Sequence, residues 1–89
     1  MPYITADKRL EISLELEALL SKVSESPEMA AGDLNYILTR VVHAYLNSSQ
    51  RGYQGYNDAM GALEGCKLEL YRRHIVPYEN RKMVENGDV

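Results

Sequence analysis

Apolar residues in the first quarter of the chain recur every three or four positions, which is the spacing of one face of an α-helix. The face comprises Ile12, Leu16, Leu19, Leu20 and Val23. Thr5 precedes it and can accept a hydrogen bond from a backbone N–H of the first turn, where Asp7 is also favourable because the amino end of a helix is positively polarised. The pattern predicts a helix over residues 6–24.

A second apolar stripe follows a connector at residues 24–32. It consists of Leu34, Leu38, Val41, Val42 and Tyr45. We expect a helix from Asp33 to about Leu46, where the segment NSSQRG interrupts the pattern. Within the connector, Ser26 and Pro27 favour a short turn.

A third stripe predicts a helix that begins near Gly52 or at Asn57. Its core positions are Ala59, Leu63, Cys66 and Leu70, flanked by Met60, Tyr71 and His74. Pro77 disfavours helical angles in the residue before it, so this helix is expected to end or kink near Val76.

Proline can itself open a short fourth helix, which we place at residues 78–85 and which Asn86 and Gly87 would terminate. No alternating pattern typical of strands competes with these helices. The predicted fold class is therefore all-α: a small helical bundle of three main helices plus a short C-terminal helix after Pro77, in a single domain over residues 1–89.

Two of the helices carry apolar or small residues on the face opposite the expected core. Each glycine inside a helix costs about 1 kcal/mol relative to alanine, so two glycines one turn apart suggest close approach by another helix. Neighbours within the chain could cover these faces, with the connector over the leucines of the first helix. Contacts in a homo-oligomer are the other interpretation, and they would also help a small core. The candidate contact residues are Leu10, Leu14, Gly61, Gly65 and Leu68.

The composition is that of a folded protein, with 45% hydrophobic and 26% charged residues. Apolar runs are far shorter than the roughly 20 residues of a membrane span, and the start MPYITADKR lacks the apolar core of a signal peptide. We therefore expect a cytoplasmic protein with no membrane partner. Cys66 is the single cysteine and is interpreted as a small buried hydrophobe.

The net charge of −3 is unevenly distributed. Residues 1–33 hold seven acidic and three basic side chains, whereas residues 67–82 hold five basic and two acidic ones. An acidic chain with one local basic cluster argues against duplex nucleic acid as a partner, because duplex binding needs many phosphate contacts. The cluster leaves room for a small anion.

Tyrosines and cations gather in two places that could bind a nucleotide or another phosphate-bearing small molecule. Arginine holds phosphate oxygens in a bidentate manner, and tyrosine offers a flat stacking surface and a hydroxyl group. The candidate ligand residues are Tyr36, Arg40 and His43 in the second helix, and Tyr71, Arg72, Arg73, Tyr78 and Arg81 around the proline. Both sets have a structural alternative: the first is a solvated helix face, and in the second Arg72 and Arg73 pair with acids of the first helix.

Catalytic motifs are not recognisable. The pairs Glu11/Glu15 and Glu64/Glu69 do not fit the carboxylate spacing with which helical nucleotide pyrophosphatases hold magnesium. Two histidines and one cysteine give no zinc spacing, and there is neither a phosphate-binding loop nor a nucleophile elbow. We expect no enzyme, metal or cofactor, although an unrecognised nucleotide hydrolase stays open as an alternative.

Three segments are distinctive when taken together: GDLNYILTRVVHAYL at 32–46, GALEGCKLELYRR at 61–73 and PYENRKMVENGDV at 77–89. They resemble a family of short uncharacterised proteins of phages and bacteria, whose usual start is similar to MPYI. The resemblance implies a phage or prophage setting, hence the host cell cytoplasm, and it carries no activity. In that setting we expect a small helical binding protein that captures a nucleotide-derived signal as an anti-defence sponge. The alternative is a protein-interaction or regulatory factor that docks a host or phage protein and has no small-molecule ligand.

Overall fold

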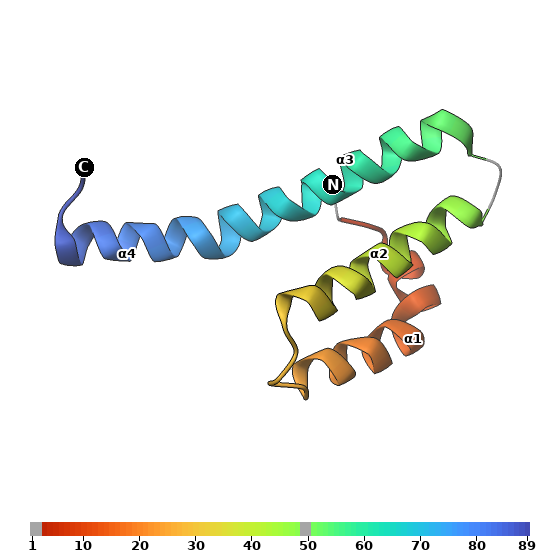
Figure 1. Cartoon of the computed structure of the whole chain (residues 1–89), viewed down its shortest axis with the longest axis horizontal. Helices are drawn as coiled ribbons and strands as arrows, with labels where there is room; N and C mark the ends of the chain where they lie inside the picture. The colour runs from red at the N-terminus through yellow and green to blue at the C-terminus, as the bar shows by residue number, and fades with distance from the viewer. Residues whose placement is uncertain (1–2, 49–50) are drawn as a thin grey trace. The chain divides into compact units, whose positions relative to one another are not determined.

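All regular structure in the described residues, 3–48 and 51–89 of the computed structural model, is helical (Figure 1). The helices are α1 (Ala6–Ser24), α2 (Ala31–Asn47), α3 (Gly52–Leu70) and α4 (Val76–Asn86), and the π-helical segment η1 (Tyr71–Ile75) joins the last two. The predicted all-α class is confirmed. The chain divides into two compact units, Tyr3–Arg51 and Gly52–Val89, and each is described by itself.

Helix α1 has the bounds that its capping signals predict. The Oγ1 atom of Thr5 accepts a hydrogen bond from the Lys8 N–H over 3.3 Å, and Asp7 lies in the first turn. At the other end, the Glu25 N–H donates to the Ser21 carbonyl oxygen over 3.0 Å. Local capping chemistry thus determines the start of this helix.

Helix α2 begins at Ala31, two residues before the predicted start. The reason is that Asp33 acts from inside the helix: its Oδ2 atom accepts a hydrogen bond from the Ala30 N–H over 2.9 Å, which is one half of a capping box. At the carboxyl end, the Arg51 Nε–H donates to the Tyr45 carbonyl oxygen over 2.9 Å. The Arg51 guanidinium also lies 3.9 Å from the centroid of the Tyr45 ring, so one cation both caps α2 and covers its last aromatic side chain.

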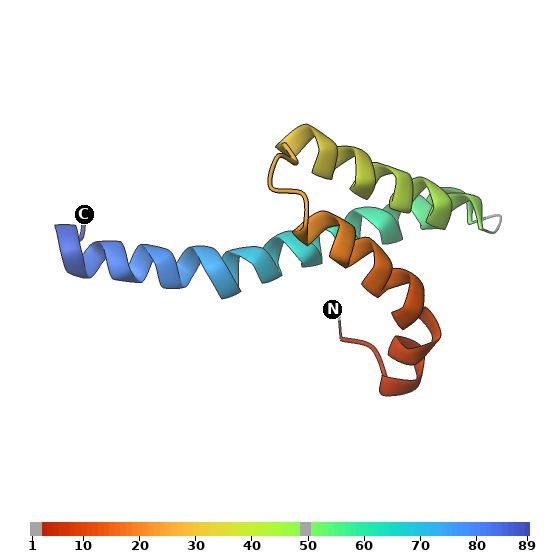
Figure 2. The same cartoon turned by 90° about the horizontal axis from the view of Figure 1, so that it is seen from below.

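Helices α3 and α4 follow one another through η1 as one helical rod (Figure 2). The predicted break at Pro77 takes the form of a change in helical geometry, in which the Val76 N–H donates to the Tyr71 carbonyl oxygen five residues back. Because Pro77 lacks an N–H and its ring crowds the carbonyl group one turn earlier, a widened turn just before it relieves both problems. Helix α4 therefore begins at Val76, before Pro77, and extends to Asn86.

Two glycines with positive φ flank this rod. Gly52 has a φ of 61° and Gly87 a φ of 88°, values that residues with a Cβ atom rarely adopt. The Gly87 N–H donates to the Met83 carbonyl oxygen over 2.9 Å, which satisfies one of the last free carbonyl groups of α4. The predicted termination at Asn86 and Gly87 is confirmed.

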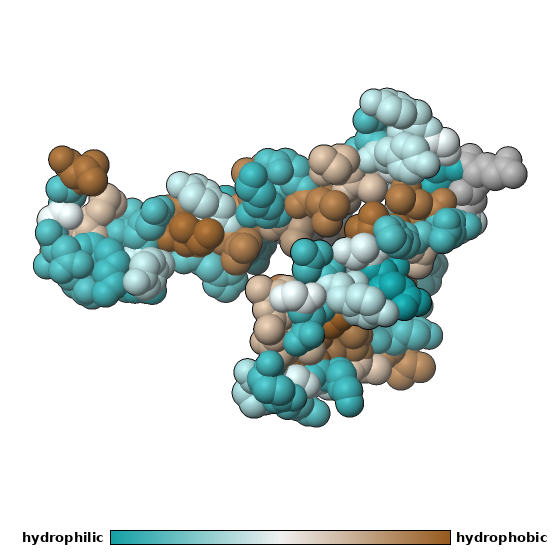
Figure 3. All heavy atoms as spheres, viewed as in Figure 1, coloured by the Kyte–Doolittle hydropathy of each residue, from teal (hydrophilic) through white to brown (hydrophobic). Residues whose placement is uncertain are grey.

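The apolar stripes are largely uncovered. Gly55 and Ala59 are the only buried residues that the structure describes, and the third stripe, predicted as core, is exposed at Leu63, Cys66 and Leu70. The predictions of a buried Cys66 and of a core along this stripe are wrong for the chain by itself, because periodicity locates an apolar face without supplying the neighbour that covers it. Figure 3 shows apolar side chains at the surface of both units.

Within the described part of the chain, no helix combines the length and the apolar character that crossing a membrane requires.

Candidate functional site

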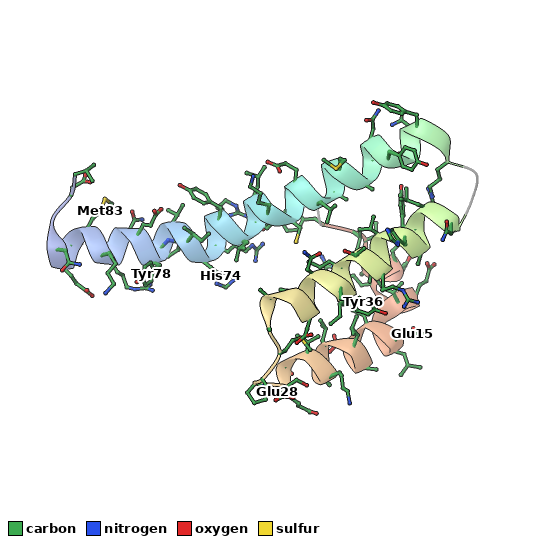
Figure 4. The ribbon with its side chains drawn as sticks, viewed as in Figure 1. Glu15, Glu28, Tyr36, His74, Tyr78 and Met83 are labelled. Atoms are coloured by element: carbon green, nitrogen blue, oxygen red, sulfur yellow. The ribbon has the colours of Figure 1, made fainter. Side chains whose placement is uncertain are left out.

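The predicted ligand residues divide between the two units. Tyr36, Arg40 and His43 lie on α2, in the unit Tyr3–Arg51, and the others lie on η1 and α4, in the unit Gly52–Val89. Figure 4 labels Tyr36 in the first group and Tyr78 in the second.

On α2, Tyr36 and Arg40 form a pair one helical turn apart. The Arg40 Nη1–H donates to the Tyr36 hydroxyl oxygen over 2.8 Å, and the guanidinium carbon lies 5.8 Å from the ring centroid. Both residues and His43 are exposed. A guanidinium has five N–H donors and this hydrogen bond uses one of them, so the pair holds the cation in place while leaving donors for an anion.

Around η1, Arg72 and Arg73 both reach back to Glu69. An Arg72 Nη2 atom lies 3.0 Å from Glu69 Oε2, and the Arg73 Nε atom lies 2.5 Å from the same oxygen. These are i,i+3 and i,i+4 pairs along one helix, where opposite charges are neighbours by geometry. The expectation that acids of the first helix neutralise these arginines overlooked Glu69, which the sequence places one turn before them.

On α4, two cations lie near the exposed ring of Tyr78. The guanidinium carbon of Arg81 lies 5.9 Å from the ring centroid and the Lys82 Nζ atom lies 5.7 Å from it. Lys82 also forms a 3.1 Å ion pair with Glu85. Lys82 was not predicted as a site residue, although its position four residues after a tyrosine was a usable signal.

Of the five candidate contact residues, Gly65 is half-buried and the other four, Leu10, Leu14, Gly61 and Leu68, are exposed. The side chains of Leu10 and Leu14 remain 73% and 80% exposed, so the connector does not cover them. At Gly61, a Cβ atom in place of the glycine hydrogen would meet no heavy atom within 4 Å, so packing within the described chain gives no reason for a glycine there. Leu68 is exposed and lies about 160° around α3 from Leu70.

Two carboxylate pairs at three-residue spacing, Glu25/Glu28 and Glu85/Asp88, were overlooked in the sequence. Glu85 is paired with Lys82, and Asp88 accepts a hydrogen bond from the Val89 N–H over 2.7 Å. In the described residues, no three or more histidine, cysteine, aspartate or glutamate side chains come together as a metal site.

The family model described as "Domain of unknown function (DUF6899)" matches residues 1–89, so the chain belongs to that family. No curated protein and no solved structure matches the chain.

Proposed function

For this member of the DUF6899 family, we propose a protein-interaction function in which the apolar faces outside the expected core dock a partner polypeptide. The observation that carries the proposal is the exposure of Leu10 and Leu14, one turn apart on α1. In the phage or prophage setting that the sequence resemblance implies, the partner is a host or phage protein.

The energetics favour a partner on this face. Removing a leucine side chain from water stabilises a complex by about 1.5–3 kcal/mol, so two leucines on one helix face are a substantial loss if they stay exposed. Gly61 supports a second contact on α3, because a helix-interior glycine costs about 1 kcal/mol and no neighbour in the described chain lies where its Cβ would be. Close approach by a partner helix explains that glycine.

The arginines of the candidate site have partners within their own helices, so a protein-interaction function needs no small-molecule ligand to account for them. Arg72 and Arg73 are engaged with Glu69, and Arg40 with Tyr36. Exposed pairs of this kind along a helix contribute only a few tenths of a kcal/mol each and are common on solvated faces. They keep the polar faces soluble while the apolar faces bind.

The experiment is affinity purification from cells of the natural source, comparing the wild type, Leu14→Asp and Lys22→Gln. Both substitutions lower the net charge by one, but Lys22 lies on another face of α1. A genuine partner is retained by wild type and Lys22→Gln, and its Kd rises at least roughly 30-fold with Leu14→Asp, because about 2 kcal/mol of burial is lost and a charge must be desolvated. A partner whose Kd is the same for Leu14→Asp and for the wild type would refute the proposed contact at the Leu10 and Leu14 face.

A second candidate function is capture of a nucleotide or related phosphate compound, with anti-defence sponging as its biological role. The specific observation behind it is that Arg81 and Lys82 place their cations 5.9 Å and 5.7 Å, respectively, from the centroid of the exposed Tyr78 ring. A base can stack on the tyrosine while the two cations bind phosphate oxygens.

Thermal shift against mono-, di- and cyclic nucleotides tests the second candidate. A ligand at 100 times its Kd stabilises the folded chain by about 2.7 kcal/mol, which raises the Tm of a domain of this size by roughly 10 °C or more. Arg81→Ala should abolish the shift, whereas Lys67→Ala, a cation away from Tyr78, should leave it. A flat response across the panel removes this candidate and leaves the protein partner. Turnover of a nucleotide in magnesium would instead point to the hydrolase alternative.

A further inference from the structure

The apolar stripe of α3 has the spacing of a helix-pairing seam. Its residues alternate between spacings of three and four, as the inward positions of coiled coils do. They are Tyr56, Ala59, Leu63, Cys66 and Leu70. Ala59 is buried, and from Leu63 onward the stripe is exposed. Within the unit Gly52–Val89 the regular structure is a single helical rod, so the unit itself offers no second helix to cover this seam.

The π-helical segment extends the seam into α4. In a regular α-helix, Ile75 would lie about 140° from Leu70 and Tyr78 about 80° from it, because each residue advances the helix by about 100°. The bond from Val76 to Tyr71 closes a turn that holds one extra residue. That residue reduces both angles, to about 40° for Ile75 and about 20° for Tyr78. Leu63, Leu70, Ile75 and Tyr78 therefore share one exposed face.

The next apolar residue labelled after Tyr78, Met83, does not continue the seam. Figure 4 shows Tyr78 and His74 on one side of the helix and Met83 on the other. Beyond the buried Ala59, the exposed part of the seam thus runs without interruption from Leu63 to Tyr78, and its midpoint lies between Leu70 and Tyr71. A partner that covers the seam must match it in length and polarity.

The charges on the rod favour a second copy in antiparallel orientation. Residues 56–70 carry three acidic and one basic side chain, a net charge of −2, and residues 71–85 carry four basic and two acidic ones, a net charge of +2. An antiparallel pair centred between Leu70 and Tyr71 places each negative half against a positive half, whereas a parallel pair places like charges together. The seam then meets itself, with Leu63 of one copy near Tyr78 of the other.

We propose that two copies of this chain pair through the exposed seam of α3, η1 and α4, as an antiparallel two-fold dimer. This face is distinct from the two faces of the proposed partner contact, which carry Leu14 on α1 and Gly61, with its neighbour Leu68, on α3, so either proposal can fail alone. The dimer buries the part of the stripe that has no second helix opposite it within the unit Gly52–Val89, and the π-helical turn is the device that keeps Ile75 and Tyr78 on it.

Sedimentation of the purified full chain tests the pairing with two matched variants. Leu70 and Leu68 are 53% and 56% exposed and lie about 160° apart on the same helix. At tens of micromolar we expect the wild type and Leu68→Asp to sediment with twice the 10.1 kDa mass of one chain, and Leu70→Asp as a monomer. A monomeric wild type, or a Leu70→Asp variant that remains dimeric, overturns the proposal.

The orientation is tested by a spin label at Val84, which is 87% exposed, as Val84→Cys in a Cys66→Ala background. In the antiparallel dimer the two labels lie about 40 Å apart, because each is about 13.5 residues from the midpoint at 1.5 Å per residue. In a parallel dimer they lie roughly 10–20 Å apart. The shorter distance overturns the antiparallel pairing, and this readout does not depend on whether Leu70→Asp folds.

Discussion

Replacing Gly61 by alanine separates the two explanations of a glycine inside α3. The new Cβ would meet no heavy atom within 4 Å in the chain, and the residue has ordinary negative φ, because Gly52 and Gly87 are the glycines with positive φ in the described residues. Only the helix propensity then changes, and it favours alanine by about 0.8–1.0 kcal/mol. For a domain of this size, that gain raises Tm by roughly 4–8 °C.

The assay is thermal unfolding followed by far-UV circular dichroism at one fixed protein concentration, because association makes Tm depend on concentration. Gly87→Ala is the control with the opposite sign: at a φ of 88°, alanine is strained by about 1–2 kcal/mol. We expect Gly61→Ala to stabilise the chain and at the same time to weaken any partner that approaches the α3 backbone there. A loss of stability in the purified protein would refute the reasoning, since it would mean that the chain or its dimer already fills the space beside Gly61.

Three further substitutions test local structure. Thr5→Ala removes the side-chain acceptor for the Lys8 N–H and should cost about 1 kcal/mol in the free energy of unfolding, measured by urea denaturation, with Thr39→Ala as a threonine control inside a helix. Arg51→Ala removes a C-terminal cap and a cation over the Tyr45 ring and should cost about 1–2 kcal/mol in the same assay, whereas an unchanged midpoint would show that the contact is worth little in solution. Pro77→Ala should retain or raise helicity but, by permitting a regular α-helical turn, rotate Ile75 and Tyr78 off the seam and weaken the dimer in sedimentation; equal dimer strength would contradict the role given to η1.

Capping residues made the helix ends readable from sequence where the signal was local. Thr5 and Gly87 act on backbone groups within four residues of themselves, so their effects need no tertiary context. The start of α2 was predicted two residues too late. A carboxylate can cap a helix from the position before it or from inside its first turn, and Asp33 does the second. Before Pro77 the sequence predicted only an end or a kink of the helix. A proline shows that the regular i→i−4 hydrogen bonds are interrupted, but it does not show which geometry replaces them.

The candidate site was less accessible to sequence reasoning. Pairs within one helix, such as Arg73 with Glu69 or Arg81 with Tyr78, follow from spacings of three and four residues and could have been predicted. The pairing of Arg72 and Arg73 with acids of the first helix stays a prediction, because that helix belongs to the other unit, whereas the pairing with Glu69 lies within one helix. Residue spacing cannot predict whether the candidate ligand residues of α2 and those of α4 bind one ligand, because the two helices belong to different units.

The sequence by itself determined that this protein is helical, where α1 begins and ends, where α4 terminates, and which helix faces are apolar, because capping and periodicity act through neighbours along the chain. The tertiary structure decided which of those faces are covered. Cys66 and Leu70 have the spacing of core residues and are exposed, since burial depends on what lies opposite a side chain and periodicity describes only the helix that carries it. The structure also decided that one extra residue in η1 keeps Ile75 and Tyr78 in line with that exposed stripe, and this is the surface to which we propose that a second copy of the chain binds.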